Sequence, residues 1–180
     1  MTRLTLLFAA VLLPALTACS PTFNWREVRP DNTGLSLLLP CNPDQAQRSV
    51  PLGGQPTELA MLGCDAGDAT FALGVATVND ASQVGAVLAG WQTATLTHIK
   101  AKAGAEQATL LKVPGAALQP QAVRVRATGQ RADGSAVQSQ AAYFAQGRQV
   151  FQAVIYADQI TPEVAETFFS SLKLAAGSPR

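Results

Sequence analysis

Hydrophobic residues alternate with polar ones along much of the chain, and this period of two indicates β-strands. Strands are predicted at residues 34–40, 48–52, 57–64, 69–78, 108–113, 121–130, 136–146 and 148–157. The short segments DAGD, ADGS and QGR between consecutive strands are typical of hairpin turns. The sheet is therefore predicted to be mostly antiparallel.

Two other stretches have the three- and four-residue spacing of amphipathic helices. The first covers residues 80–101, with Asp80 or Ser82 as its N-cap. Its predicted inward side chains are Val84, Val87, Leu88, Trp91, Thr95 and His98. The second covers residues 161–174, where Thr161 caps the helix and a proline takes the first helical position.

Two of the strands indicate how the helices and the sheet pack. Residues 69–78 carry large side chains on one face and only Ala72, Gly74 and Ala76 on the other, which lets another element approach closely. Residues 148–157 are apolar on both faces, as expected of a central strand that is covered on both sides. The sequence thus predicts an α+β fold, with a mostly antiparallel sheet on which a mid-chain helix and a C-terminal helix pack.

The first 18 residues have the pattern of an export signal. Arg3 precedes an apolar core over residues 4–16, and small residues follow it. This core holds about a dozen residues and contains Pro14, whereas a bilayer-spanning helix needs roughly 20 apolar residues. We therefore predict a cleaved signal peptide at residues 1–18 and no transmembrane anchor.

The signal ends in LTAC, residues 16–19, which resembles the lipobox of bacterial lipoproteins. The resemblance implies that Cys19 becomes the N-terminus, with a diacylglyceryl group on its thiol and a further acyl chain, such as palmitate, on its amine. Two or three chains give stable membrane anchoring. Ser20, in place of an aspartate, implies the outer membrane, facing the periplasm. The alternative is an ordinary secreted protein with a cysteine here by chance.

The remaining chain is predicted to form one domain. Residues 19–34 are assigned to a lipid-anchored leader that reaches at most about 50 Å, residues 35–175 to a single α+β domain, and residues 176–180 to a flexible tail. Phe23 and Trp25 in the leader either touch the lipid interface or pack on the edge of the domain.

Cys41 and Cys64 remain as a pair once Cys19 carries lipid. Thiols within reach of each other tend to become disulfides in an oxidising compartment, so we predict a Cys41–Cys64 bond. Redox chemistry is the alternative, but it favours a C-x-x-C motif, which the sequence lacks.

The order of elements resembles a known fold. A strand ending in LLP, a hairpin, a mid-chain helix, a three-stranded meander and the closing AETFFSSLKL helix are similar to the Mog1/PsbP-like α/β sandwich. NWREVRP, LLPC and FFSSLKL also resemble a family of uncharacterised bacterial envelope lipoproteins. Members of the fold serve as photosystem assembly factors, small-GTPase binders and secretion accessories, so the resemblance implies a fold without selecting a function.

Charge and motif content narrow the function classes. The chain has 13 Lys and Arg against 12 Asp and Glu, and the signal removes only Arg3, so the mature domain lacks the basic excess of a nucleic-acid binder. His98 is the only histidine and is either a general base or a half-buried structural residue. The sequence contains no G-x-S-x-G, P-loop, H-E-x-x-H or calcium-loop motif. We predict neither enzymatic activity nor a cofactor or metal.

Three arginines form the one candidate ligand site. Arg124 and Arg126 share a strand face, and a hairpin about Gly134 is expected to bring Tyr143 opposite Arg124, with Arg148 nearby. Such a cluster binds a phosphate or carboxylate group. The alternative is a solvated face whose charges protect the sheet against edge pairing.

The predicted function is that of a non-enzymatic, membrane-anchored envelope lipoprotein whose domain is an interaction or accessory module with a protein partner. The alternative is a periplasmic carrier of an apolar or lipid ligand. A carrier requires a dry cavity, lined by the residue 84–91 part of the first helix and by Phe71, Leu73 and Ile155.

Overall fold

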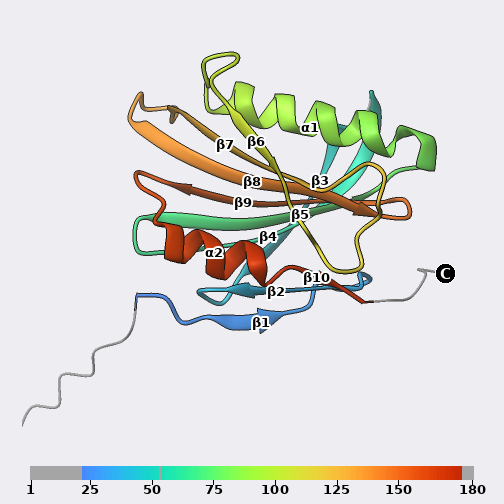
Figure 1. The fold of residues 1–180 in the computed structure, drawn as a ribbon, viewed down its shortest axis with the longest axis horizontal. Coiled ribbons are helices and arrows are strands. Elements are labelled where there is room, and N and C mark those ends of the chain that lie inside the picture. Colours follow the sequence, from blue (N-terminus) through green and yellow to red (C-terminus); the bar gives the residue numbers. More distant parts are fainter. Residues whose placement is uncertain (1–21, 53, 176–180) are drawn as a thin grey trace, which may run out of the picture.

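The computed structural model describes residues 22–52 and 54–175, which fold into three layers (Figure 1). The strands are β1 (Arg26–Val28), β2 (Leu35–Leu39), β3 (Asp44–Leu52), β4 (Gln55–Ala66), β5 (Ala69–Thr77), β6 (Gln107–Leu110), β7 (Val123–Gln130), β8 (Ala136–Gln146), β9 (Gln149–Ala157) and β10 (Lys173–Leu174), and the helices are α1 (Val84–His98) and α2 (Pro162–Ser170). The predicted α+β class with a mostly antiparallel sheet is confirmed.

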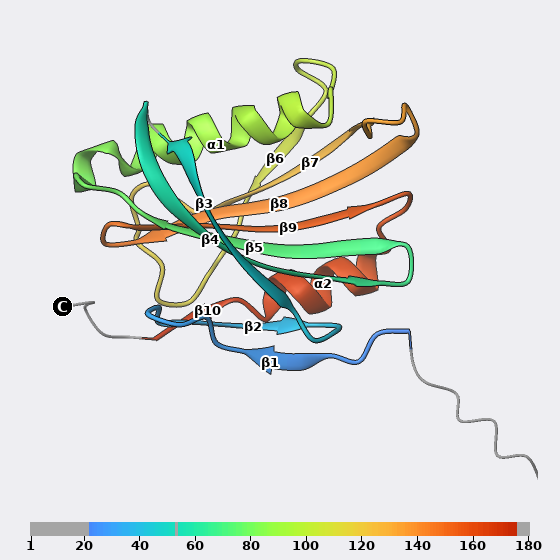
Figure 2. The same ribbon diagram turned by 180° about the vertical axis from the view of Figure 1, so that it is seen from behind.

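The central layer is a seven-stranded sheet in the order β3-β4-β5-β9-β8-β7-β6, in which all neighbours are antiparallel. β9 lies in the middle, as its two apolar faces predict. β3 is longer than the predicted strand at residues 48–52, because its first residues are polar and exposed and give no hydrophobic alternation. The β3–β4 hairpin runs obliquely across the sheet (Figure 2).

Helix α1 covers one face of the sheet, where the sequence predicted a close approach. A Cβ atom at Gly74 would lie 2.7 Å from Cζ2 of Trp91, so only glycine leaves room for the indole ring. Asp80 caps the preceding 3₁₀ turn, Ala81–Gln83, by accepting a 2.8 Å hydrogen bond from the Ser82 amide. His98 is exposed, contrary to its predicted inward position, because the helix ends there and Ile99 takes the buried place.

The second face is covered by α2 together with a small sheet in the order β1-β2-β10. Its core contains a chain of aromatic contacts, with ring centroids 5.4 Å apart for Phe71 and Phe168. Thr161 caps α2, as predicted, by accepting a hydrogen bond from the Val164 amide. The predicted Cys41–Cys64 disulfide is present and packs against this core.

The prediction that residues 19–34 form a leader outside the domain is wrong for residues 22–34, the part that the structure describes. Residues Arg26–Val28 form β1, which pairs with β2. Phe23 and Trp25 pack edge-on against Phe71, with centroids 6.1 and 5.7 Å away, so of the two alternatives the packed edge is observed. The error arose because β1 is too short and too exposed to give a strand pattern.

Three predictions lie outside the described residues. These are the signal peptide at residues 1–18, the lipidation of Cys19 and the tail at residues 176–180. Within residues 22–52 and 54–175, no helix is both long enough and apolar enough to cross a membrane.

Candidate interaction surface

Two leucines beside the edge strand β6 are the large hydrophobic side chains left exposed in the described part of the chain. The exposed fractions are 73% for Leu110, at the end of β6, and 86% for Leu118, in the segment that follows. Exposed apolar side chains are ordinary when scattered singly, but a group of them beside a hollow is typical of a binding site.

A hollow of about 550 Å³ lies between these two leucines and the residues around them. Its lining is mainly apolar: Leu110, Leu111, Val113, Ala116, Ala117, Leu118 and Ala122 contribute, together with Gln119, Gln121 and Lys112. Lys112 is the only charged member of this set. We call the outer edge of β6 together with this hollow the β6 surface.

The segment that carries Leu118 is fixed to the domain by backbone contacts at several points. The amide of Leu111 donates to the Ala122 carbonyl at 2.9 Å, and the amide of Ala117 donates to the Ala145 carbonyl at 2.7 Å. Gly115 has a φ of +79°, and a Cβ there would collide with the Leu174 carbonyl. Leu118 is therefore exposed on an ordered segment and not on a free loop.

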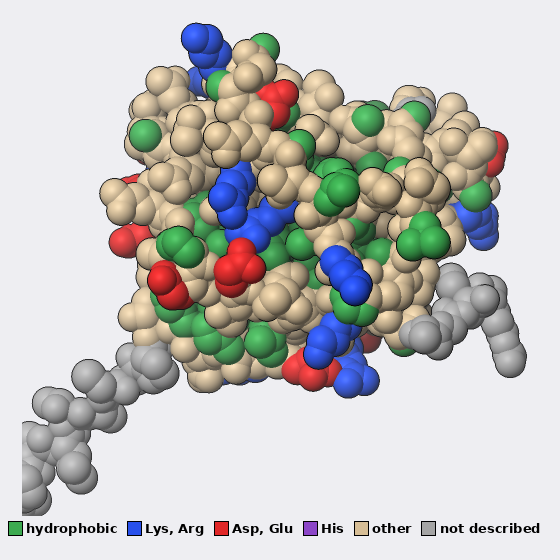
Figure 3. All heavy atoms as spheres, viewed as in Figure 1, with side chains coloured by type: hydrophobic (Ala, Val, Ile, Leu, Met, Phe, Trp, Pro, Cys, Tyr) green, Lys and Arg blue, Asp and Glu red, His purple; other side chains and the backbone are tan. Residues whose placement is uncertain are grey.

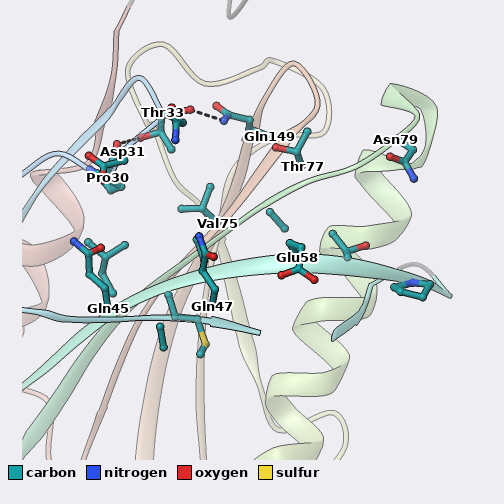
Figure 4. Close-up of a pocket in the computed structure, with 18 residues that line it drawn as sticks. Pro30, Asp31, Thr33, Gln45, Gln47, Glu58, Val75, Thr77, Asn79 and Gln149 are labelled. Carbon is teal, nitrogen blue, oxygen red and sulfur yellow. Dashed lines mark hydrogen bonds between the residues drawn. The ribbon is translucent and has the colours of Figure 1, made fainter. Parts of the chain in front are cut away.

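A second, larger groove lies on the α2 side of the sheet, beyond the edge of the small sheet (Figure 4). It has a volume of about 740 Å³ and is lined by strands β3, β4 and β5 and by residues 30–33. Its polar side chains include Gln45, Gln47, Glu58 and Gln149, and the last of these donates a 2.9 Å hydrogen bond to the Asn32 carbonyl. Apolar side chains, among them Met61, Leu62 and Val75, also line it, so polar and apolar groups share this groove.

The residues predicted to line the cavity of the carrier alternative lie on opposite faces of the sheet. Phe71, Leu73 and Ile155 are completely buried and belong to the core under α2. Helix α1 packs on the opposite face, in a separate core cluster. The sheet thus separates helix α1 from the three side chains that were expected to enclose a ligand together with this helix.

Arg124 is occupied within the structure instead of being open to a ligand. Its side chain is 7% exposed and forms a 2.7 Å ion pair with Glu166 of α2. The same guanidinium donates at 2.6 and 3.1 Å to Oε1 of Gln140 and lies 4.4 Å from the centroid of the Phe169 ring. Figure 3 shows basic and acidic side chains adjoining each other on this face. Arg124 therefore joins α2 to the sheet.

The other members of the predicted anion site do not join Arg124. Tyr143 lies opposite Val123, and Ala142 lies opposite Arg124. A difference of one residue in register moves a side chain to the other face, so Tyr143 packs under α1. Arg126 is exposed and lines a separate hollow of about 260 Å³.

Arg148 lies in the β8–β9 turn and donates to the Asn79 carbonyl at 3.3 Å. This turn begins after Gln146, about 13 Å along β8 from Ala142, the partner of Arg124. The three arginines are therefore not brought together, and the predicted anion site is not assembled.

The polar groups buried under α1 form a structural network. Nε2 of Gln152 donates to Oγ1 of Thr95 at 2.6 Å and to the Tyr143 hydroxyl at 3.1 Å, and Thr95 donates to the Trp91 carbonyl at 2.9 Å. Burial raises the pKa of Tyr143, and burial with the charge of Tyr143 raises the pKa of Tyr156 to about 12. These groups satisfy one another and offer no free base or nucleophile.

The sequence analysis missed the β6 surface, for which the sequence held only a partial signal. The segment ATLLKV was assigned to a strand, without any distinction between its two leucines. Leu110 and Leu111 are neighbours, and neighbouring side chains of a strand point to opposite faces. At the edge of the sheet only Leu111 is packed against the core.

Comparison with known proteins gives no functional match. No family model matches the sequence, and no curated protein matches it. A protein of known structure from Bacteroides thetaiotaomicron is 13% identical, with a TM-score of 0.48 over 83% of this chain and 48% of its own. The protein of unknown function PA94 from Pseudomonas aeruginosa is 16% identical, with a TM-score of 0.35 over 78% of this chain and 85% of its own. This chain spans about half the length of the Bacteroides protein.

Proposed function

We propose that this chain is a non-enzymatic lipoprotein of the bacterial cell envelope, anchored through Cys19 to the outer membrane on its periplasmic side, which binds another protein through the β6 surface. The observation that carries the binding role is the exposure of Leu110 and Leu118 beside an apolar hollow. The lipobox LTAC carries the anchoring role. The likeness to Mog1/PsbP-like proteins and to envelope lipoproteins stays a prediction.

The packing of Phe23 determines how close the domain lies to the membrane under this proposal. Residues 20–22 alone separate Cys19 from Phe23, so their Cα atoms are at most about 14 Å apart. Thr22 and Phe23 lie against Gly67 in the β4–β5 turn. This end of the domain is therefore held next to the lipid, in place of the 50 Å reach expected of a free leader.

The β6 surface extends toward the other end of the sheet. β5 starts beside the β4–β5 turn, where Ala69 pairs with Ala157. At the far end of β5, Thr77 pairs with Gln149, which lies next to the β8–β9 turn. The segment carrying Leu118 is bonded to Ala145, near that far turn. Such an arrangement presents Leu118 away from the anchored end and toward a partner in the periplasm.

Two measurements test this proposal. The intact mass of protein purified from its native-type envelope should correspond to a chain that begins at Cys19 and carries acyl chains, and Cys19→Ala should abolish the modification. A photo-crosslinking amino acid at position 118 should give a discrete adduct in envelopes, whereas the same group in place of the exposed Glu163 on α2 should not. Unmodified protein contradicts the anchor, and identical adducts at both positions contradict the binding surface.

A further inference from the structure

We infer that the partner binds by adding an extended segment to the outer edge of β6 as an eighth strand, with one of its apolar side chains in the hollow beside Leu118. This inference rests on the proposed function, because it names the kind of partner that the β6 surface accepts. It is carried by the free backbone groups of β6, by the apolar hollow next to them and by the contrast with the opposite edge of the sheet.

The register of β6 shows which backbone groups have no partner strand in the described part of the chain. The amide of Leu111 bonds to the Ala122 carbonyl, and paired residues in an antiparallel ladder alternate between bonded and non-bonded pairs. Gln107 and Thr109 therefore form their backbone hydrogen bonds with β7. The N–H and C=O groups of Ala108 and Leu110 point outward, where the sheet ends.

Backbone groups of this kind pair readily with an extended chain. In strand addition, main-chain hydrogen bonds supply affinity and pockets for alternate side chains supply specificity. The outward groups of Ala108 and Leu110 supply the first element, and the hollow between Leu110 and Leu118 supplies the second. Lys112, two residues after the end of β6, favours an acidic residue at the matching end of the partner segment.

The opposite edge of the sheet carries two protecting residues that β6 lacks. β3 contains Arg48 and Pro51, and a charge or a proline on an edge strand is a common defence against edge pairing. β6 reads QATL, without a charge or a proline. Because both strands end the same sheet, the difference between them selects β6 as the edge that is left available.

Ala108→Pro tests the strand pairing directly. It removes one outward donor and blocks the edge, and it costs no hydrogen bond to β7 because the Ala108 amide points away from that strand. The matched control is Ala108→Val, which keeps the amide and favours a strand. Both variants should show the thermal unfolding midpoint of the wild type to within a few degrees.

The probe is a short, fluorescently labelled peptide in which threonine and leucine alternate and which ends in glutamate. The full chain with Cys19→Ala should bind this peptide. Ala108→Pro and Leu118→Ser should each lower the affinity at least about tenfold, and Ala108→Val should leave the affinity unchanged. Hydrogen exchange of the chain that keeps Ala108 should show new protection of the Ala108 and Leu110 amides when the peptide is added. This second readout does not depend on how the proline variant folds.

The outcomes separate this inference from the proposed function. Equal peptide binding by the wild type and Ala108→Pro, or no new protection at Ala108 and Leu110, overturns strand addition. If position 118 still crosslinks to one protein in envelopes, the binding role stands without strand pairing. Dimerisation of the chain that Ala108→Pro abolishes would make the occupant a second copy and would overturn the assignment to a different protein.

Discussion

Helix α1 and helix α2 cover opposite faces of one sheet, but the contacts beneath them differ. Under α1, a large side chain, Trp91, packs onto a strand face with no side chain at Gly74, and the buried polar groups are neutral. Under α2, the layers are joined by a disulfide and by the ion pair between the buried Arg124 and the exposed Glu166. Shape complementarity closes the first face, whereas specific bonds between distant residues join the second.

The difference has a consequence for stability. A face closed by shape should be sensitive to added volume and insensitive to the loss of one polar group. A face joined by covalent and ionic contacts should respond in the opposite way. The four predictions that follow test this contrast, in order of decreasing effect on the free energy of unfolding at neutral pH.

The largest effect is expected from removal of the disulfide on the α2 side. Cys41 and Cys64 are 23 residues apart in sequence, and closing a loop of this size stabilises a fold by about 3 kcal/mol. The double variant Cys41→Ala/Cys64→Ala should lose about that amount in urea denaturation of the Cys19→Ala chain. Amides in α1 should keep their exchange protection in native buffer longer than those in β2.

This prediction has a control in the wild-type protein. Reduction of the Cys19→Ala chain should reproduce the stability of the double variant, since both remove the same covalent bond. A double variant as stable as the oxidised protein would contradict the view that the disulfide joins the layers on this face.

The second effect concerns the volume beneath α1. Gly74→Ala places a methyl group within 2.7 Å of the Trp91 ring, so it should cost about 1–3 kcal/mol. Trp91→Leu should remove most of that additional cost, which a double-mutant cycle measures. Gly90→Ala in α1, where no atom lies within 4 Å of the new methyl group, is the matched control and should be stabilising. Additive costs at Gly74 and Trp91 would contradict the shape argument.

The close packing under α1 and the disulfide on the α2 side could be predicted from the sequence, but the ion pair under α2 could not, for a physical reason. Trp91 and its neighbours repeat at helical spacing, and the small residues around Gly74 are local in sequence, so both signals lie within short windows. The ion pair under α2 joins residues 42 positions apart. In the sequence, Arg124 alternates with apolar residues like any solvated strand residue, and nothing local shows that α2 will cover it.

The candidate interaction surface was hidden for a related reason. Whether Leu110 belongs to the core depends on β6 being the last strand of its sheet, which is a property of the topology and not of the segment. Leu118 lies outside any periodic segment, and its exposure follows from the path of residues 111–122 over the sheet. Hydrophobic pattern therefore located the core strands but gave no means of separating a buried leucine from an exposed one at an edge.

The third effect tests the ion pair under α2. Glu166→Ala leaves the buried Arg124 guanidinium with Gln140 alone as acceptor, so it should destabilise by about 1 kcal/mol. Glu163→Ala removes a carboxylate from the same helix without touching Arg124 and is the matched control. It should cost less than half as much in urea denaturation. Equal losses would mean that both carboxylates act only through their position in the helix.

The smallest effect is confined to alkaline pH and to the α1 face. Folding keeps Tyr156 neutral because burial, with the charge of Tyr143, raises its pKa to about 12, whereas an unfolded tyrosine ionises near pH 10. A folded pKa above the unfolded value means that this contribution is complete below pH of about 10 and is lost as the pH rises toward 12. The unfolded state then binds fewer protons than the folded one.

Tyr156→Phe removes that ionisation and keeps the ring, so the midpoint of alkaline unfolding should move to higher pH, as followed by phenolate absorbance together with circular dichroism. The exchange protection of α1 should be lost before that of β2, because both tyrosines with a raised pKa lie on the α1 side. The aromatic residues on the α2 side are phenylalanines and Trp25, which do not titrate. An unchanged midpoint in the variant would show that alkaline unfolding starts elsewhere. The two faces would then not differ in their sensitivity to alkaline pH through Tyr156.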